Sequence, residues 1–196
     1  VNPRGELVVP DYYSQLVLDG RVFNASNAVQ ETAANLNETA RGADNINPVL
    51  LLDVPSGTTV MPLEIILATS GTGTAEDLTV TINTDDATRW SSGGAAITAL
   101  NMHKNDPVTT TCTFYAGTTQ IVATANTDDD TIYAARVDAT QIATPTRPFL
   151  EWSARQFVAP VLYGPASLLV FITSTTDDHT FFFSVKWFEM SSLVAT

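Results

Sequence analysis

Three strand-like, threonine-rich runs in this chain each end in the same turn, Thr-Asp-Asp. The turns lie at residues 84–86, 127–129 and 176–178. Apolar and β-branched residues enter each turn, and similar runs leave the second and the third. Aspartate favours turns because its carboxylate bonds to nearby backbone amides, and such runs around a short polar turn are typical of hairpins. The chain is therefore predicted to be all-β, with antiparallel strands that form hairpins at these turns.

Further strand-like runs recur about every eight to twelve residues, a spacing typical of a sandwich or barrel. In chain order the runs lie at residues 48–54, 60–69, 78–82, 109–115, 119–125, 131–137, 149–152, 156–161, 168–173 and 181–188. Threonine makes up 29 of the 196 residues, and it suits strands because it is β-branched yet carries a hydroxyl. We therefore predict one antiparallel β-sandwich domain over residues 48–196, of the jelly-roll type.

Residues 1–47 are predicted to form an N-terminal arm and one short helix. The stretch up to Phe23 has an extended character, with Leu16-Val17-Leu18 followed by a turn at Asp19-Gly20. The helix is predicted over residues 27–41, where small apolar residues recur with helical spacing at Val29, Ala33, Leu36 and Ala40. This stripe is too small to hold the helix alone. Either the arm and helix dock on a neighbouring subunit, or they fold back on their own sandwich.

The charge balance excludes two classes of partner. The chain has 21 acidic and 9 basic residues, for a formal net charge of −12. So few cations leave little to neutralise phosphates, so we expect no binding to nucleic acid or to an anionic membrane surface. No apolar run approaches the roughly 18 residues that a membrane span needs.

The turn aspartates are the best candidates for binding a metal ion. Asp128, Asp129 and Asp130 follow one another in the second turn, where like charges repel unless a cation neutralises them. Carboxylate and carbonyl oxygens suit Ca²⁺, although the ligand spacing of an EF-hand is absent. The alternative is that these aspartates are solvated turn residues. No other cofactor is expected.

No set of residues in the sequence forms a recognisable active site. The histidines are His103 and His179, both in turn-like surroundings, and no serine lies in a Gly-x-Ser-x-Gly motif. Glu64 and Glu151 lie in strand-like runs and would have to meet across a sheet to act as a glycosidase pair. Cys112 alternates with threonines, which indicates a small core residue rather than a reactive thiol.

Aromatic residues are concentrated towards the C-terminal end. In the run 181–188, Phe181 and Phe183 would lie on one face and Phe182 on the other, which predicts a strand buried on both sides. The alternative is a carbohydrate-binding platform, for which Trp90 and Trp152 are the candidates for exposed aromatic residues.

The order of these segments resembles that of virus and bacteriophage structural proteins of the single jelly-roll kind. The resemblance covers roughly residues 48–190, from the runs 50–60 and 62–67 through the threonine-rich strands to 181–188. It implies two packed four-stranded sheets, with loops and arms that join subunits into trimers or larger shells. It contains no diagnostic motif, so it assigns no catalytic or binding residue.

The sequence is compatible with three functions. The first is a non-enzymatic virion protein, a capsid, minor capsid or cement subunit, which forms a homo-oligomer, expected to be a trimer, and contacts other virion proteins. The second is a carbohydrate- or receptor-binding module such as a phage fibre head. The third is a hydrolase whose carboxylates meet only in space.

Overall fold

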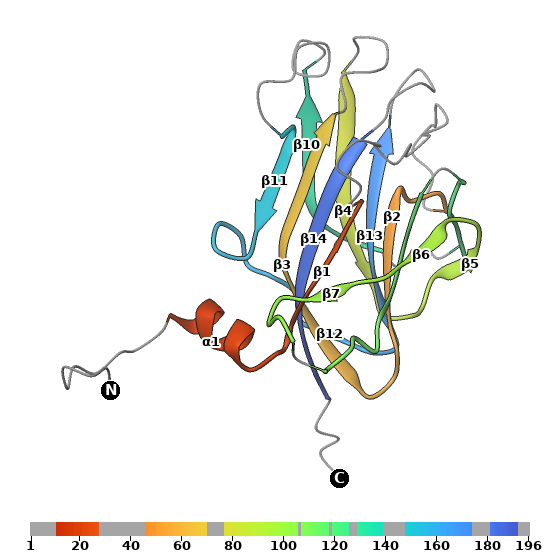
Figure 1. Ribbon diagram of the computed structural model, residues 1–196. Coiled ribbons are helices and arrows are strands. Elements are labelled where there is room, and N and C mark those ends of the chain that lie inside the picture. Colours follow the sequence, from red (N-terminus) through yellow and green to blue (C-terminus); the bar gives the residue numbers. More distant parts are fainter. Residues whose placement is uncertain are drawn as a thin grey trace, which may run out of the picture.

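Two antiparallel sheets pack face to face as a sandwich in the computed structural model, with one short helix beside them (Figure 1). The structure describes residues 11–27, 46–69, 77–105, 107–117, 119–125, 129–138, 148–173 and 181–191. The predicted all-β sandwich with antiparallel strands is therefore confirmed.

Sheet 1 has the strand order β11-β3-β14-β1-β7, with β12 also paired to β3. Its strands are β1 (Val22–Ser26), β3 (Thr58–Thr69), β7 (Leu100–Asn101), β11 (Leu150–Ser153), β12 (Leu162–Tyr163) and β14 (Phe181–Ser191). Sheet 2 has the order β10-β4-β13-β2-β8-β6. Its strands are β2 (Leu50–Val54), β4 (Leu78–Asp85), β6 (Ala95–Ile97), β8 (Thr113–Ala116), β10 (Asp130–Val137) and β13 (Ala166–Thr173). A small third sheet pairs β5 (Trp90–Ser92) with β9 (Val122–Ala123).

The core fills the space between the two large sheets with alternating residues of their strands. In β14 the buried side chains are Phe181, Phe183, Val185 and Trp187. Phe182 points to the other face and is 37% exposed, so the prediction that this strand is buried on both sides is wrong. Sheet 1 therefore keeps an outer face that is partly open to solvent, as antiparallel sheets commonly do.

The predicted hairpins do not form at the turns that the structure describes. After the turn at Asp85, β4 leads to β5 in the third sheet, and β4 itself pairs with β10 and β13. Likewise β9 and β10, on either side of the second turn, belong to different sheets. Among the described strands, no neighbours in a sheet are consecutive in sequence. The local pattern identified the strands, but each partner comes from a distant part of the chain.

The N-terminal stretch that was predicted to be extended contains the helix α1 (Tyr12–Leu18). Asp11 caps it, because the Asp11 carboxylate accepts hydrogen bonds from the backbone N–H groups of Tyr13 (3.0 Å) and Ser14 (3.1 Å). Gly20, with a φ of 65°, ends it. Leu16 is buried against sheet 1 and Tyr13 packs beside it, so the helix is held by helical rather than alternating contacts.

Part of the range assigned to the arm belongs to the sandwich. β1 lies between β14 and β7 in sheet 1, so the sheet begins well before residue 48. The predicted helix at 27–41 falls almost wholly on residues 28–45, which lie outside the described residues. In the part of the chain that is described, no helix is long and apolar enough to cross a membrane.

One predicted strand is absent. Residues 156–161 form an irregular segment between β11 and β12 rather than a strand. Several of its apolar side chains are exposed.

Candidate functional site

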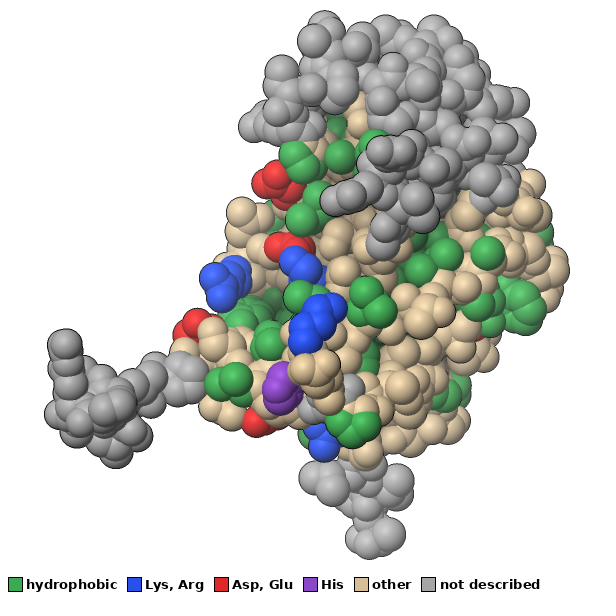
Figure 2. Space-filling view, in the orientation of Figure 1, with side chains coloured by type: hydrophobic (Ala, Val, Ile, Leu, Met, Phe, Trp, Pro, Cys, Tyr) green, Lys and Arg blue, Asp and Glu red, His purple; other side chains and the backbone are tan. Residues whose placement is uncertain are grey.

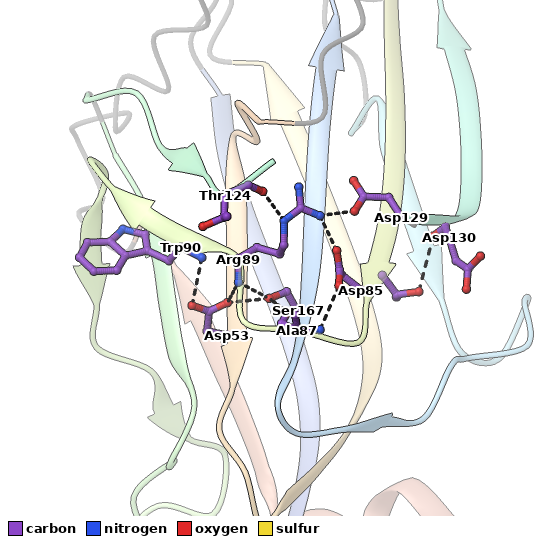
Figure 3. A network of polar contacts seen from close by, with 10 residues as sticks. Asp53, Asp85, Ala87, Arg89, Trp90, Thr124, Asp129, Asp130 and Ser167 are labelled. Carbon is purple, nitrogen blue, oxygen red and sulfur yellow. Dashed lines mark hydrogen bonds and ion pairs between the residues drawn. The ribbon is translucent and has the colours of Figure 1, made fainter. Parts of the chain in front are cut away.

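The most elaborate polar cluster of the described residues surrounds the buried side chain of Arg89. Its guanidinium contacts the carboxylates of Asp85 and Asp129 through the same nitrogen, Nη1 (Figure 3). Nε donates a hydrogen bond to the backbone carbonyl of Thr124 at 2.6 Å. The side chains of Arg89 and Asp85 are 2% and 0% exposed. A buried guanidinium is tolerated here because carboxylates and a carbonyl oxygen surround it.

A second half of the cluster fixes the backbone of the same segment. The backbone N–H of Arg89 lies 3.0 Å from Oδ1 of Asp53 and 2.9 Å from Oγ of Ser167. Ser167 Oγ in turn lies 2.6 Å from Asp53 Oδ1 and 2.8 Å from the carbonyl oxygen of Ala87. We call these residues together the Arg89 network: Asp53, Asp85, Ala87, Arg89, Thr124, Asp129 and Ser167. It joins β2, β4 and β13 to the segments around β5, β9 and β10 (Figure 3).

The carboxyl group of Asp129 is electrostatically unusual. Burial raises the pKa of this group, the adjoining Asp85 carboxyl raises it further, and Arg89 opposes both. Its second oxygen, Oδ2, is buried without a hydrogen-bond partner. The Asp129 carboxyl therefore retains a proton more readily than an isolated aspartate does.

Two of the three predicted calcium residues, Asp129 and Asp130, are described by the structure. Asp129 contacts Arg89, so a guanidinium neutralises one of the clustered charges. Asp130 is exposed at the start of β10, and Asp128 lies outside the described residues. Within the described ranges, no three residues of the His, Cys, Asp and Glu types are grouped as metal ligands. Calcium binding by Asp128, Asp129 and Asp130 stays a prediction.

The Arg89 network has the arrangement of a structural clasp. Ser167 Oγ is fully buried and lies within hydrogen-bond distance of Asp53, Arg89 and Ala87, so its hydroxyl is used within the network. His103 is exposed in the turn after β7, as predicted, and its backbone N–H donates to Asn101 at 2.9 Å. His179 lies outside the described residues.

The two glutamates considered for hydrolysis lie on the same face of sheet 1. Glu151 in β11 lies opposite Ile66 in β3, and Glu64 is two residues before Ile66, so both carboxylates project from the same face. They line a polar pocket of about 330 Å³. Glu64 also forms an ion pair with Lys186.

A second pocket lies between α1 and sheet 1. Its volume is about 400 Å³, and its floor is formed by Val17, Val22, Leu63 and Met102. Arg155 and Lys186 stand at its rim. Figure 2 shows Lys and Arg side chains gathered around an apolar hollow on this face. Arg155 lies over the ring of Tyr13 at 4.7 Å from the centroid, which helps to hold α1 in place.

A third pocket, of about 650 Å³, is lined by both acidic and apolar residues. Asp85, Asp86 and Asp130 form one side, and residues 160–163, which include Tyr163, form the other. Tyr163 is thus the exposed aromatic residue that the sequence did not single out. Of the two predicted platform residues, Trp90 is 40% exposed and stacks on Tyr115 at 4.7 Å between centroids. Trp152 is fully buried in the core, so its prediction as an exposed residue is wrong.

A separate clasp closes around the carboxylate of Glu189 in β14. It accepts hydrogen bonds from the hydroxyl groups of Thr110 (2.5 Å) and Thr111 (2.8 Å) and from the backbone N–H of Thr111 (2.8 Å). Burial raises the pKa of the neighbouring Cys112 thiol, and the charge of Glu189 adds to this effect. Cys112 is therefore a core residue, as predicted.

Comparison with known proteins gives no relative from which a function could be transferred. No protein-family model matches the chain, and neither a curated protein nor a solved structure shows significant similarity to it.

Proposed function

We propose that this chain is a non-enzymatic structural protein of a virus or bacteriophage particle, a capsid, minor capsid or cement subunit that assembles with copies of itself. The observation that carries the proposal is the segment of residues 157–165 between β11 and β13, which contains no charged side chain and exposes large apolar ones. Contiguous exposed apolar surface in a folded protein marks a site of interaction. In a chain with a net charge of −12, such an uncharged segment is the part of the surface best suited to contact another acidic copy.

The strand order supports the jelly-roll form of this proposal. In sheet 2 the late strand β13 lies between the early strands β2 and β4. A late strand that returns beside an early one is the mark of Greek-key connections, two of which make up a jelly roll. The turn after β2 also crosses from sheet 2 to sheet 1, as the connections between layers of such a sandwich do.

The first test is the size of the assembled protein. Sedimentation velocity over a wide range of concentrations should show a defined oligomer, expected to be a trimer, and electron microscopy should show regular particles at high concentration. A strict monomer at the highest concentration would contradict the proposal. Turnover of polysaccharides that disappears in Glu64→Gln would favour the hydrolase instead.

The proposed trimer contact involves the N-terminal arm. β1 is a sheet strand, so deleting residues 1–47 would damage the sandwich itself. Deleting residues 1–10 leaves both α1 and β1 in place and is the cleaner experiment. Loss of the trimer with unchanged far-UV circular dichroism would support the arm contact, and an unchanged trimer would contradict it.

A carbohydrate- or receptor-binding module is the second candidate, favoured by the pocket that combines Tyr163 with Asp86 and Asp130. Aromatic faces and carboxylates together suit sugar rings, which present C–H groups and hydroxyls. Glycan-array binding that is lost in Tyr163→Ala, but kept when Trp90 is replaced by alanine, would favour this function.

A further inference from the structure

The segment 157–163 exposes more apolar surface than a soluble chain normally leaves uncovered. The exposed fractions are 41% for Phe157, 96% for Val158, 52% for Val161 and 68% for Tyr163. No charged residue occurs from Gln156 to Thr173. Runs of exposed apolar residues of this length require a functional explanation. We call residues 157–163 the apolar strip.

The apolar strip is held in position at both ends. At its start, the backbone N–H of Phe157 donates to the carbonyl of Ser153 at 3.0 Å. Just beyond its end, Gly164 donates to the carbonyl of Thr58 at 2.9 Å. Between these points, Leu162 is buried and anchors the strip in the core. A surface that is already ordered loses little conformational entropy on binding, so it is suited to a specific contact.

One ring contact and one shared pocket give the direction of the strip along the edge strand β10. The ring of Phe157 meets that of Tyr133 with centroids 5.3 Å apart. Further along the strip, residues 160–163 share the large pocket with Asp130, the first residue of β10. The strip therefore runs from the side of Tyr133 towards the start of β10.

Opposite charges stand at the two ends of the strip. Arg155, whose side chain is 68% exposed, lies two residues before its start, and the contact of Arg155 with Asp11 is long, at 3.7 Å. Asp86 and Asp130, both exposed, stand beside its other end. The cation, the apolar strip and the two carboxylates thus follow one another along the surface.

We infer that the apolar strip is a two-fold contact between two copies of this chain, in which the strips lie antiparallel and Arg155 of each copy faces Asp86 and Asp130 of the other. A two-fold contact joins the same patch of both subunits, so a patch must complement itself. An antiparallel arrangement places the positive end of one strip against the negative end of the other, twice, and covers the apolar residues between them. The inference deepens the proposed function and rests on its self-association, since a two-fold contact would link the proposed trimers.

The first experiment places a charge in the middle of the strip. Val158→Asp should raise the dissociation constant of the two-fold contact at least about tenfold in sedimentation velocity, since the apolar contact is lost on both copies. Val108→Asp is the matched control, because Val108 is also exposed but lies outside the strip, and it should leave the constant unchanged.

The second experiment exchanges the charges at the two ends. Arg155→Glu alone, and the double variant Asp86→Arg with Asp130→Arg, should each fail to form the two-fold contact because like charges then face one another. In an equal mixture of the two variants, each copy meets its complement, and the contact should return. A variant that had lost its fold could not be rescued by a partner, so recovery also excludes simple misfolding.

The outcomes separate this inference from the proposed function. Dissociation by Val158→Asp together with recovery in the mixture supports the two-fold contact. An oligomer that Val158→Asp leaves intact overturns the inference and leaves self-assembly standing. Dissociation without recovery in the mixture overturns the antiparallel arrangement. A wild-type chain that stays monomeric at all concentrations overturns both the inference and the proposed self-assembly. The same conclusion holds if the strip binds a different protein and no second copy of this chain.

Discussion

Replacing Arg89 with methionine tests whether the Arg89 network holds the sandwich together. Methionine keeps the long, unbranched stem of the side chain but removes the guanidinium that Asp85 and Asp129 contact. Two buried carboxylates then lose their cation, and the Thr124 carbonyl loses a donor at 2.6 Å. Burial of charge without a partner is costly, so the variant should be markedly less stable.

The loss of unfolding free energy expected for Arg89→Met follows from the burial of Asp85 and Asp129. Removing one member of a buried ion pair costs about 3–5 kcal/mol, and since Asp129 relieves part of the strain by taking up a proton, we expect about 4 kcal/mol. This is a large share of the roughly 5–15 kcal/mol by which a domain is stable. The matched control is Arg136→Met, because Arg136 pairs with Asp77 at the surface, with its side chain 74% exposed. Such a pair should contribute less than about 1 kcal/mol.

Urea denaturation followed by tryptophan fluorescence measures both variants on the same scale. If Arg89→Met loses no more free energy of unfolding than Arg136→Met, the network does not act as a buried clasp. A triple variant with Arg89→Met, Asp85→Asn and Asp129→Asn provides a second check. It should recover at least half of the loss, because replacing all the charges of a buried cluster removes the unpaired ones as well.

Three further predictions concern single buried groups. The raised pKa of Asp129 means that the folded chain keeps a proton that the unfolded chain releases, so stability should fall as pH rises from the ordinary aspartate pKa through the raised value. Asp129→Asn should flatten this decline, measured as the free energy of unfolding from urea titrations at a series of pH values. If the slope against pH is unchanged in the variant, a group other than Asp129 causes the decline. The Cys112 thiol, buried and with a raised pKa, should react with a thiol reagent such as DTNB only after unfolding; rapid labelling of the native chain would contradict its burial. Glu189→Ala should cost about 3 kcal/mol in urea denaturation because it leaves the buried donors of Thr110 and Thr111 unpaired.

The sequence predicted strands well but could not predict their partners. The run at residues 78–82 is indeed part of β4, and the turn at Asp85 indeed ends it. Pairing depends on contacts between distant segments, whereas a turn signal records only the backbone conformation at the turn. Here the aspartate turns connect different sheets, so the same residues that indicated hairpins mark changes of sheet. Because every described pairing is non-local, we expect slow folding for a chain of this size.

Helix α1 was missed because two patterns compete in a short segment. Seven residues contain too few apolar positions to separate a period of 2 from one of 3.6. The end signals were present, since Asp11 is a good N-cap and Gly20 a good C′ residue. In a segment this short, the capping residues carry more information than the apolar pattern.

The candidate site was half visible in the sequence. Repulsion within the run 128–130 indicated that these three aspartates need a cation, and Arg89 is the cation that Asp129 contacts. Arg89 follows Asp85 by four residues across the first aspartate turn, a spacing that could have suggested the pair. The sequence could not show that Asp129, Asp53 and Ser167 lie close to Arg89, because these residues come from segments far apart in the chain.

The uncharged, apolar sequence of the strip is compatible with burial beneath another sheet of the same chain or beneath a second subunit. Residues 156–161 were predicted to be a strand because they form one of the regularly spaced strand-like runs of a sandwich. The structure places them outside the sheets with Val158 almost fully exposed, so the chain itself does not cover them. The segment has the apolar composition of a buried strand, yet it lies on a surface that the single chain leaves exposed. This pattern is expected where a second subunit packs on the segment. The failed strand prediction and the proposed two-fold contact therefore have the same origin, an apolar segment that the single chain leaves exposed.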